Sequence, residues 1–82
     1  MNLSNCSVGI IGLGQMGGSL ALRLSQVYDF TQIAGLDQKR DLVDAAISVH
    51  AIGKTYPTAE NLVEESDVVI IALPIAEILR LL

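Results

Sequence analysis

Three glycines near the start of the chain, Gly12, Gly14 and Gly17, have the spacing G-x-G-x-x-G. In this pattern the first glycine permits a tight turn, the second lets a phosphate approach the backbone, and the third lets a helix pack closely on a strand. The following helix would present the unpaired amides of Gln15, Met16 and Gly17, and the positive end of its dipole, to an anion. The pattern therefore predicts a cradle for the diphosphate of a dinucleotide, and these five residues are its candidate ligands.

A carboxylate stands at the distance that a ribose ligand requires. Asp37 follows the apolar run 32–36 and lies about 20 residues beyond the third glycine. Its oxygens are expected to accept hydrogen bonds from both hydroxyls of the adenosine ribose and to repel a 2′-phosphate, which favours NAD over NADP. Lys39 and Arg40 follow at once, and they either offset part of that repulsion or form a solvated first helical turn.

A second pair of candidate cofactor ligands ends the most apolar run of the chain, residues 68–73. We expect this strand to lie beside the first strand, so that Leu73 and Pro74 reach the point where the nicotinamide half binds. The alternative is that Pro74 only ends the strand.

The elements that must position these residues alternate between strand and helix. We expect strands at 7–12, 32–37 and 68–73, helices at 15–28, 39–51 and 58–64, a short third strand and turn at 55–58, and a last helix from 75. The expected apolar stripes are Met16, Leu20, Leu24 and Val27 in the first helix, and Leu42, Ala46 and Val49 in the second. Gly53 is the expected C-cap of the second helix and Thr58 the N-cap of the third. This order predicts an α/β fold, a Rossmann-type doubly wound parallel sheet that is incomplete, with about four of the usual six strands.

Composition excludes several classes of function. The net charge is −4 and no basic cluster occurs, so the sequence predicts no nucleic-acid partner. A single cysteine, Cys6, excludes an internal disulfide and a thiolate metal cage, and no metal site is expected. No signal peptide or membrane span is recognisable, which makes a cytoplasmic protein without a membrane partner the default expectation.

The segment from Gly12 to Ala21, G-L-G-Q-M-G-G-S-L-A, resembles the opening of prephenate and arogenate dehydrogenases, and Gly18-Ser19-Leu20 is its most discriminating part. Residues 33–37 and 66–74 resemble the second and fourth strands of that family. The resemblance implies an NAD-dependent oxidative decarboxylation of prephenate or arogenate on the route to tyrosine, and a homodimer when the protein is full length. It also implies that residues 1–82 are the N-terminal part of a dinucleotide-binding domain, with the catalytic residues and the substrate and dimerisation domain elsewhere.

Two other readings stay open. The 3-hydroxyacid dehydrogenases share G-L-G-x-M-G, but they commonly carry Asn-Arg where this chain has Asp37-Gln38. The NAD-sensing domains of potassium channels and transporters bind nucleotide without catalysis, but they typically carry G-D-A-[ST] where this chain has the residues 53–57. No catalytic residue is assigned, because the only histidine, His50, falls late in the second predicted helix, away from the strand ends where chemistry occurs.

Overall fold

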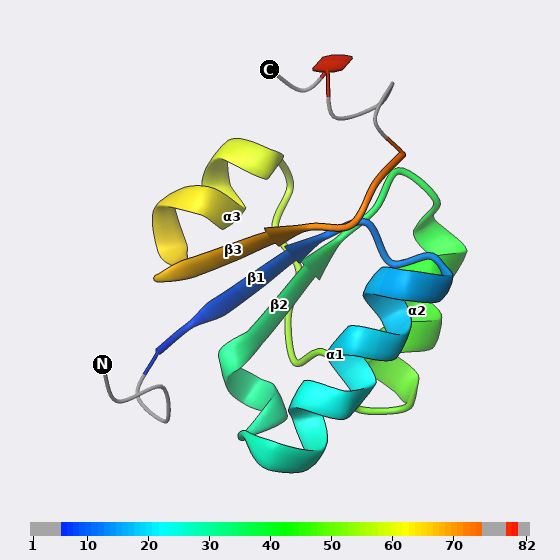
Figure 1. The fold of residues 1–82 in the computed structure, drawn as a ribbon, viewed down its shortest axis with the longest axis vertical. Helices are drawn as coiled ribbons and strands as arrows, with labels where there is room; N and C mark the ends of the chain where they lie inside the picture. Colours follow the sequence, from blue (N-terminus) through cyan, green and yellow to red (C-terminus); the bar gives the residue numbers. More distant parts are fainter. Residues whose placement is uncertain (1–5, 75–78, 81–82) are drawn as a thin grey trace.

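Three short parallel strands form the centre of the computed structural model, which describes residues 6–74 and 79–80 (Figure 1). The strands are β1 (Val8–Ile11), β2 (Ile33–Leu36) and β3 (Val68–Ile71), in the order β2-β1-β3. The central position of β1 confirms that the strand before Pro74 lies beside the first strand. It also places the carboxyl ends of all three strands at one edge of the sheet.

Helices cover both faces of this sheet, as the apolar character of neighbouring strand residues predicts. Helices α1 (Gln15–Val27) and α2 (Arg40–Ser48) lie on one face, and α3 (Ala59–Glu65) lies on the other (Figure 1). Ile10 belongs to the cluster beneath α1 and α2, whereas Ile11 belongs to the cluster beneath α3. The incomplete α/β Rossmann-like fold predicted from the sequence is therefore confirmed.

The buried face of α1 differs from the predicted stripe. Met16 and Val27 are 81% and 77% exposed, and the buried residues of the helix are Gly17 and Ala21. Leu24 of the predicted stripe packs against the core but is only partly buried. At Gly17 no larger residue fits, because a Cβ there would overlap the carbonyl oxygen of Gly12. The prediction for α2 is wrong at Val49, which is exposed, while Ala46 is buried as expected.

The end of α2 is also different from the expected one. Gly53 is not its C-cap, because the helix closes at His50, whose φ of 59° lies in the left-handed region. The amide of Ala51 donates to the carbonyl of Ala46 at 2.9 Å, the bond that defines a Schellman cap. The His50 ring stacks on Phe30, with 4.7 Å between the ring centroids.

The segment before α3 does not form the predicted strand. Instead of a strand at 55–58, a single parallel bridge joins Lys54 to Ala34, so the described sheet has three strands where about four were expected. The predicted N-cap is confirmed, since the Thr58 hydroxyl accepts the Asn61 amide at 3.1 Å. The helix expected from residue 75 lies largely outside the described residues, of which 79–80 are helical. Within the described part of the chain, no helix has the length and hydropathy needed to span a bilayer.

Replacing Leu62 in α3 by alanine tests the packing of this helix. Leu62 is fully buried, and its side chain occupies the space that a Cβ on Gly9 would need. Leu62→Ala is expected to lower the free energy of unfolding by about 2–5 kcal/mol, because it opens a cavity between helix and sheet. Urea titration followed by circular dichroism measures the change.

The matched control is Val63→Ala, on the exposed side of the same helix. Its expected cost is below about 1 kcal/mol. Equal losses for the two variants would contradict the packing of α3 on the sheet.

Candidate functional site

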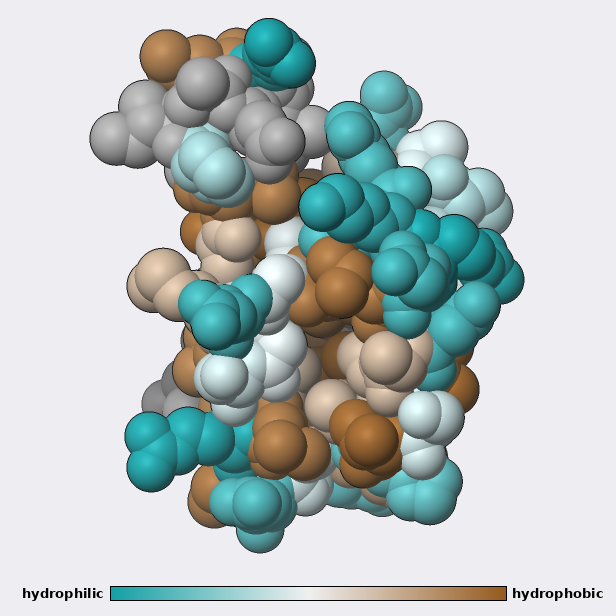
Figure 2. Space-filling view, turned by 90° about the vertical axis from the view of Figure 1, so that its right-hand side faces the viewer, coloured by the Kyte–Doolittle hydropathy of each residue, from teal (hydrophilic) through white to brown (hydrophobic). Residues whose placement is uncertain are grey.

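A cavity of about 640 Å³ lies at the carboxyl ends of the three strands. Its walls come from the turns after β1, β2 and β3 and from the start of α3. Figure 2, which views the molecule from the side of α1 and α2, shows a recess in the upper part of this face. The lining residues are Ile11, Gly12, Gly14, Leu36, Asp37, Gln38, Lys39, Leu42, Pro57, Thr58, Ala59, Ala72, Leu73, Pro74 and Arg80.

The three glycines have three different physical roles, as predicted. Gly12 has a φ of 98°, and a Cβ there would lie 2.5 Å from the carbonyl oxygen of Ala72. A Cβ on Gly17 would overlap the carbonyl oxygen of Gly12. A Cβ on Gly14, in contrast, would meet no atom within 4 Å. Gly12 and Gly17 thus have no room for a side chain, whereas the space beside Gly14 is open.

Helix α1 begins at this open space. Gly14 is its N-cap, and the amide of Gly18 donates to the Gly14 carbonyl at 2.8 Å. The three preceding amides come before this first bond of the helical ladder and are left for an external acceptor. No acidic side chain lies in the first turn to compete for them. The geometry fits a diphosphate held by backbone amides.

Asp37 connects the glycine turn to the end of β2. Its Oδ2 accepts the amide of Leu13 at 2.7 Å, and its Oδ1 accepts the amide of Lys39 at 2.9 Å. A carboxylate has about four lone-pair positions, so each oxygen keeps one for a further donor. Asp37 therefore fixes the glycine turn and retains the capacity to accept two ribose hydroxyls.

The end of β3 closes the opposite wall. The Ala72 amide donates to the carbonyl of Ile11 at 2.8 Å, which holds the exit of β3 against the exit of β1. Leu73 and Pro74 follow directly and line the cavity. Their position matches the expectation that β3 ends at the switch point of the sheet.

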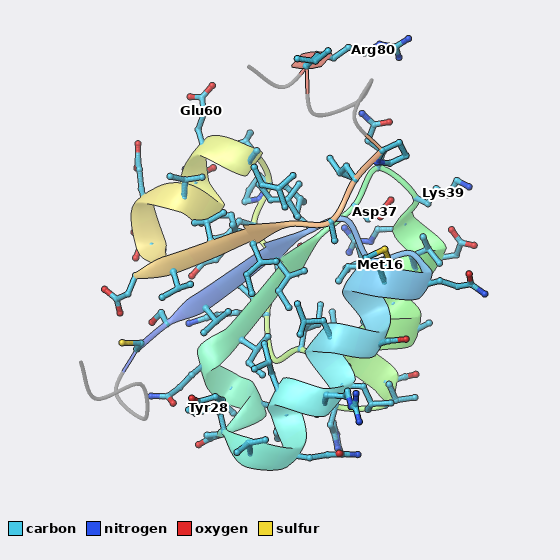
Figure 3. The ribbon with its side chains drawn as sticks, viewed as in Figure 1. Met16, Tyr28, Asp37, Lys39, Glu60 and Arg80 are labelled. Atoms are coloured by element: carbon cyan, nitrogen blue, oxygen red, sulfur yellow. The ribbon has the colours of Figure 1, made fainter. Side chains whose placement is uncertain are left out.

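Two residues with cationic side chains are also among the lining residues, Lys39 after β2 and Arg80 beyond β3, and Figure 3 shows the Lys39 side chain extending outward from the turn. Arg40 does not line the cavity, and its Nε lies 3.5 Å from Asp44 Oδ1 one turn along α2. The sequence suggested the same two possible roles for Lys39 and Arg40, whereas in the structure only Lys39 is a lining residue of the cavity.

The structure thus brings together five of the eight predicted ligands, namely Gly12, Gly14, Asp37, Leu73 and Pro74. Gln15 and Met16 are exposed at the start of α1 but do not line the cavity, and Gly17 is buried beneath the turn. The sequence reasoning missed residues 57–59 at the start of α3. The predicted third strand before α3 was a signal for them, because a segment that runs parallel to β2 ends, as β2 does, at the carboxyl ends of the strands.

The residues that could act as acids or metal ligands do not gather here. His50 lies at the far end of α2 and contacts Phe30, which precedes β2, so it belongs to the opposite edge of the sheet. Among residues 6–74 and 79–80, no group of three or more His, Cys, Asp or Glu side chains is placed to hold a metal ion.

Comparison with known families agrees with this geometry. Residues 7–82 match the model of a family described as NADP oxidoreductase, coenzyme F420-dependent. Because the match covers nearly the whole chain, the chain belongs to this family. It is therefore an NAD(P)-binding oxidoreductase domain.

Replacement by alanine is expected to have different effects at Gly17 and at Gly14. Gly17→Ala is expected to lower the free energy of unfolding by at least about 2 kcal/mol, because the new methyl overlaps a backbone carbonyl. Gly14→Ala is expected to change it by less than about 1 kcal/mol and to weaken NAD(P) binding at least about tenfold, since the methyl enters the phosphate space.

Urea unfolding and calorimetric titration measure the two effects separately. A Gly14→Ala protein that binds NAD(P) as the unsubstituted chain does would contradict this assignment of the phosphate position.

Proposed function

Starting from membership in this oxidoreductase family, we propose that the chain binds NAD in the cavity at the strand ends. We further propose that it forms the N-terminal cofactor-binding part of a prephenate dehydrogenase-like enzyme. The observation that carries the cofactor proposal is the joint position of Gly14, the N-cap of α1 beside open space, and of the Asp37 carboxylate in the lining of one cavity. A diphosphate and its neighbouring ribose need this pair of groups side by side.

Asp37 supports NAD rather than the NADP that the family description names. Its two oxygens are held in place by backbone amides, so the carboxylate cannot readily turn away from a 2′-phosphate. Two like charges at contact distance in a partly buried site are strongly unfavourable. The 2′-hydroxyl of NAD, by contrast, gains a hydrogen bond to a charged acceptor.

The resemblance of Gly18-Ser19-Leu20 and of residues 66–74 supports the prephenate proposal. The nicotinamide, when bound, supplies the hydride acceptor. The ring carbon that bears the hydroxyl loses a hydride, the bond to the ring carboxylate breaks, and its electron pair makes the ring aromatic as carbon dioxide leaves. The residues of this chain bind and orient the cofactor, and the substrate and dimerisation parts of the proposed homodimer lie in other segments.

Titration of Asp37→Asn with NAD and with NADP tests the cofactor proposal. The expected result is a loss of NAD affinity of about tenfold or more, because a hydrogen bond to a charged acceptor is lost. NADP binding should fall less or rise, because the repulsion of its 2′-phosphate disappears. Isothermal titration calorimetry gives both dissociation constants.

Asp41→Asn is the matched control, because Asp41 is an exposed acid on the first turn of α2 and does not line the cavity. It should leave both affinities within about twofold. If Asp37→Asn weakened both cofactors equally, Asp37 would act only through the glycine turn and the preference for NAD would be refuted.

The substrate proposal is tested by two linked assays. The 82-residue chain should bind NAD without forming NADH from prephenate, since its only histidine lies far from the cavity. A polypeptide that adds the substrate domain should form NADH and carbon dioxide in equal amounts. Oxidation of a 3-hydroxyacid in place of prephenate would overturn the proposal in favour of the related dehydrogenases.

A further inference from the structure

β3 forms one edge of the described sheet and is less buried than its neighbours. β1 and β2 each contain three buried residues out of four, whereas no residue of β3 is buried and Ile71 is 39% exposed. β2 and β3 lie on opposite sides of β1 (Figure 1), and among the described residues no strand or bridge pairs with the outer side of β3. Such an edge can pair with a strand of another chain.

The hydrogen bonds of β3 show which of its backbone groups face outward. The amides of Val68 and Ala72 both donate to carbonyl oxygens of the β1 segment, at 3.1 and 2.8 Å. Successive residues of a strand direct their backbone groups to opposite sides, so the amides and carbonyls of Val69 and Ile71 point away from β1. The outer side of β3 therefore offers hydrogen-bond donors and acceptors from both of these residues.

The residues of β3 do not protect this edge. Natural proteins often place charged residues or prolines on a free edge, but β3 has neither. The nearest charge, the Asp67 carboxylate, accepts the amide of Ser7 at 2.8 Å and is thereby turned toward the β1 segment. The edge thus combines outward-facing hydrogen-bonding groups with apolar surface. On the α1 side the strand borders an apolar groove of about 170 Å³, lined by Val8, Leu24, Tyr28, Val68 and Ile70.

We propose that two copies of this chain pair antiparallel through β3, about a twofold axis perpendicular to the sheet. With the axis at Ile70, Val69 of each copy lies opposite Ile71 of the other. These two residues carry the outward-facing groups, so all of these amides and carbonyls become hydrogen-bonded between the copies. Ile70 lies beside Ile70 of the second copy on the α1 side of both sheets, which adds an apolar neighbour at the groove.

The edge is self-complementary in charge as well as in hydrogen bonding. The register places Asp67 opposite Leu73 of the second copy, so the two Asp67 carboxylates lie about 20 Å apart. Moving the axis by one residue would pair part of the strand with Asp67 or Leu73, which lie outside β3. The Asp67 amide, moreover, already donates to the carbonyl of Ser7 at 2.8 Å. The pairing centred on Ile70 is therefore the one that joins strand residues only to strand residues.

Sedimentation equilibrium tests whether the dimer exists. The 82-residue chain should dimerise with a dissociation constant in the micromolar range, because the paired segment is short. Ile71→Pro removes an outward-facing amide, which proline can do in an edge strand without breaking a bond inside the copy. It should weaken dimerisation at least about tenfold. Ile71→Val, which keeps the amide, is the matched control and should stay within about threefold.

Disulfide crosslinking tests the register without a proline. In a Cys6→Ser background, Ile70→Cys should form a covalent dimer on oxidation with diamide. The α-carbons of a directly opposed, non-hydrogen-bonded pair lie about 4.5 Å apart, within the reach of a disulfide. Ile71→Cys is more exposed but should not crosslink, because the two Ile71 positions lie diagonally across the strands and beyond that reach.

A chain that stays monomeric at millimolar concentration would overturn the inference. Equal crosslinking at positions 70 and 71 would also overturn it, because random collisions favour the more exposed thiol. If Ile71→Pro lost its circular dichroism spectrum, the crosslinking pair would decide alone. The inference does not rest on the proposed function, and the contact differs from the dimerisation segments proposed for the longer enzyme. Titration with NAD therefore tests the cofactor proposal separately.

Discussion

The close approach of helix α1 to the turn after β1 is the constraint on which the rest of the site depends. The contact has no room for a side chain, because a Cβ on Gly17 would overlap the carbonyl of Gly12. The same turn is held from the other side by Ala72, whose carbonyl oxygen excludes a Cβ on Gly12. These two backbone contacts together fix the start of α1, the exit of β1 and the exit of β3 relative to one another. The open space at Gly14 is a result of this arrangement.

Asp37, which lines the cavity, is also part of the scaffold. Its carboxylate joins the glycine turn to the end of β2 through the amides of Leu13 and Lys39. Both bonds are made to the charged form of the side chain, and they orient it before any ligand arrives. Preorganisation of this kind reduces the entropy lost on binding. In the proposed function, the bonds that hold this framework would therefore also orient the group that selects the cofactor.

Much of this arrangement could be predicted from the sequence, because the relevant constraints are local. Strands buried on both faces are apolar at every position, and glycines mark the turn that needs them, so the parallel sheet, the pairing of the last strand with the first and the glycine turn after β1 were predicted correctly. The errors concern positions that depend on distant contacts. Met16 and Val27 are exposed although the helical period groups them with Leu24, which packs against the core, and α2 ends with His50 in the left-handed region without a glycine. Residues 57–59 line the cavity, and the segment before them is held to β2 only by the bridge between Lys54 and Ala34. A single bridge leaves no periodic pattern in the sequence.

The parallel pairing of the strands has a consequence for the order in which the site forms. Val8 pairs with Ile33 on one side and with Val68 on the other, so the second pairing closes a much longer stretch of chain. The entropy of closing the longer loop alone makes the β1–β3 pairing less favourable than the β1–β2 pairing by roughly 0.8 kcal/mol. β3 is also an edge of the described sheet, and its last residue, Ile71, is partly exposed. The cavity wall that contains Asp37 thus rests on the pairing of β1 with β2, which closes the shorter loop. The wall formed by Leu73 and Pro74 rests on the pairing of β1 with β3, and its opening costs the least free energy.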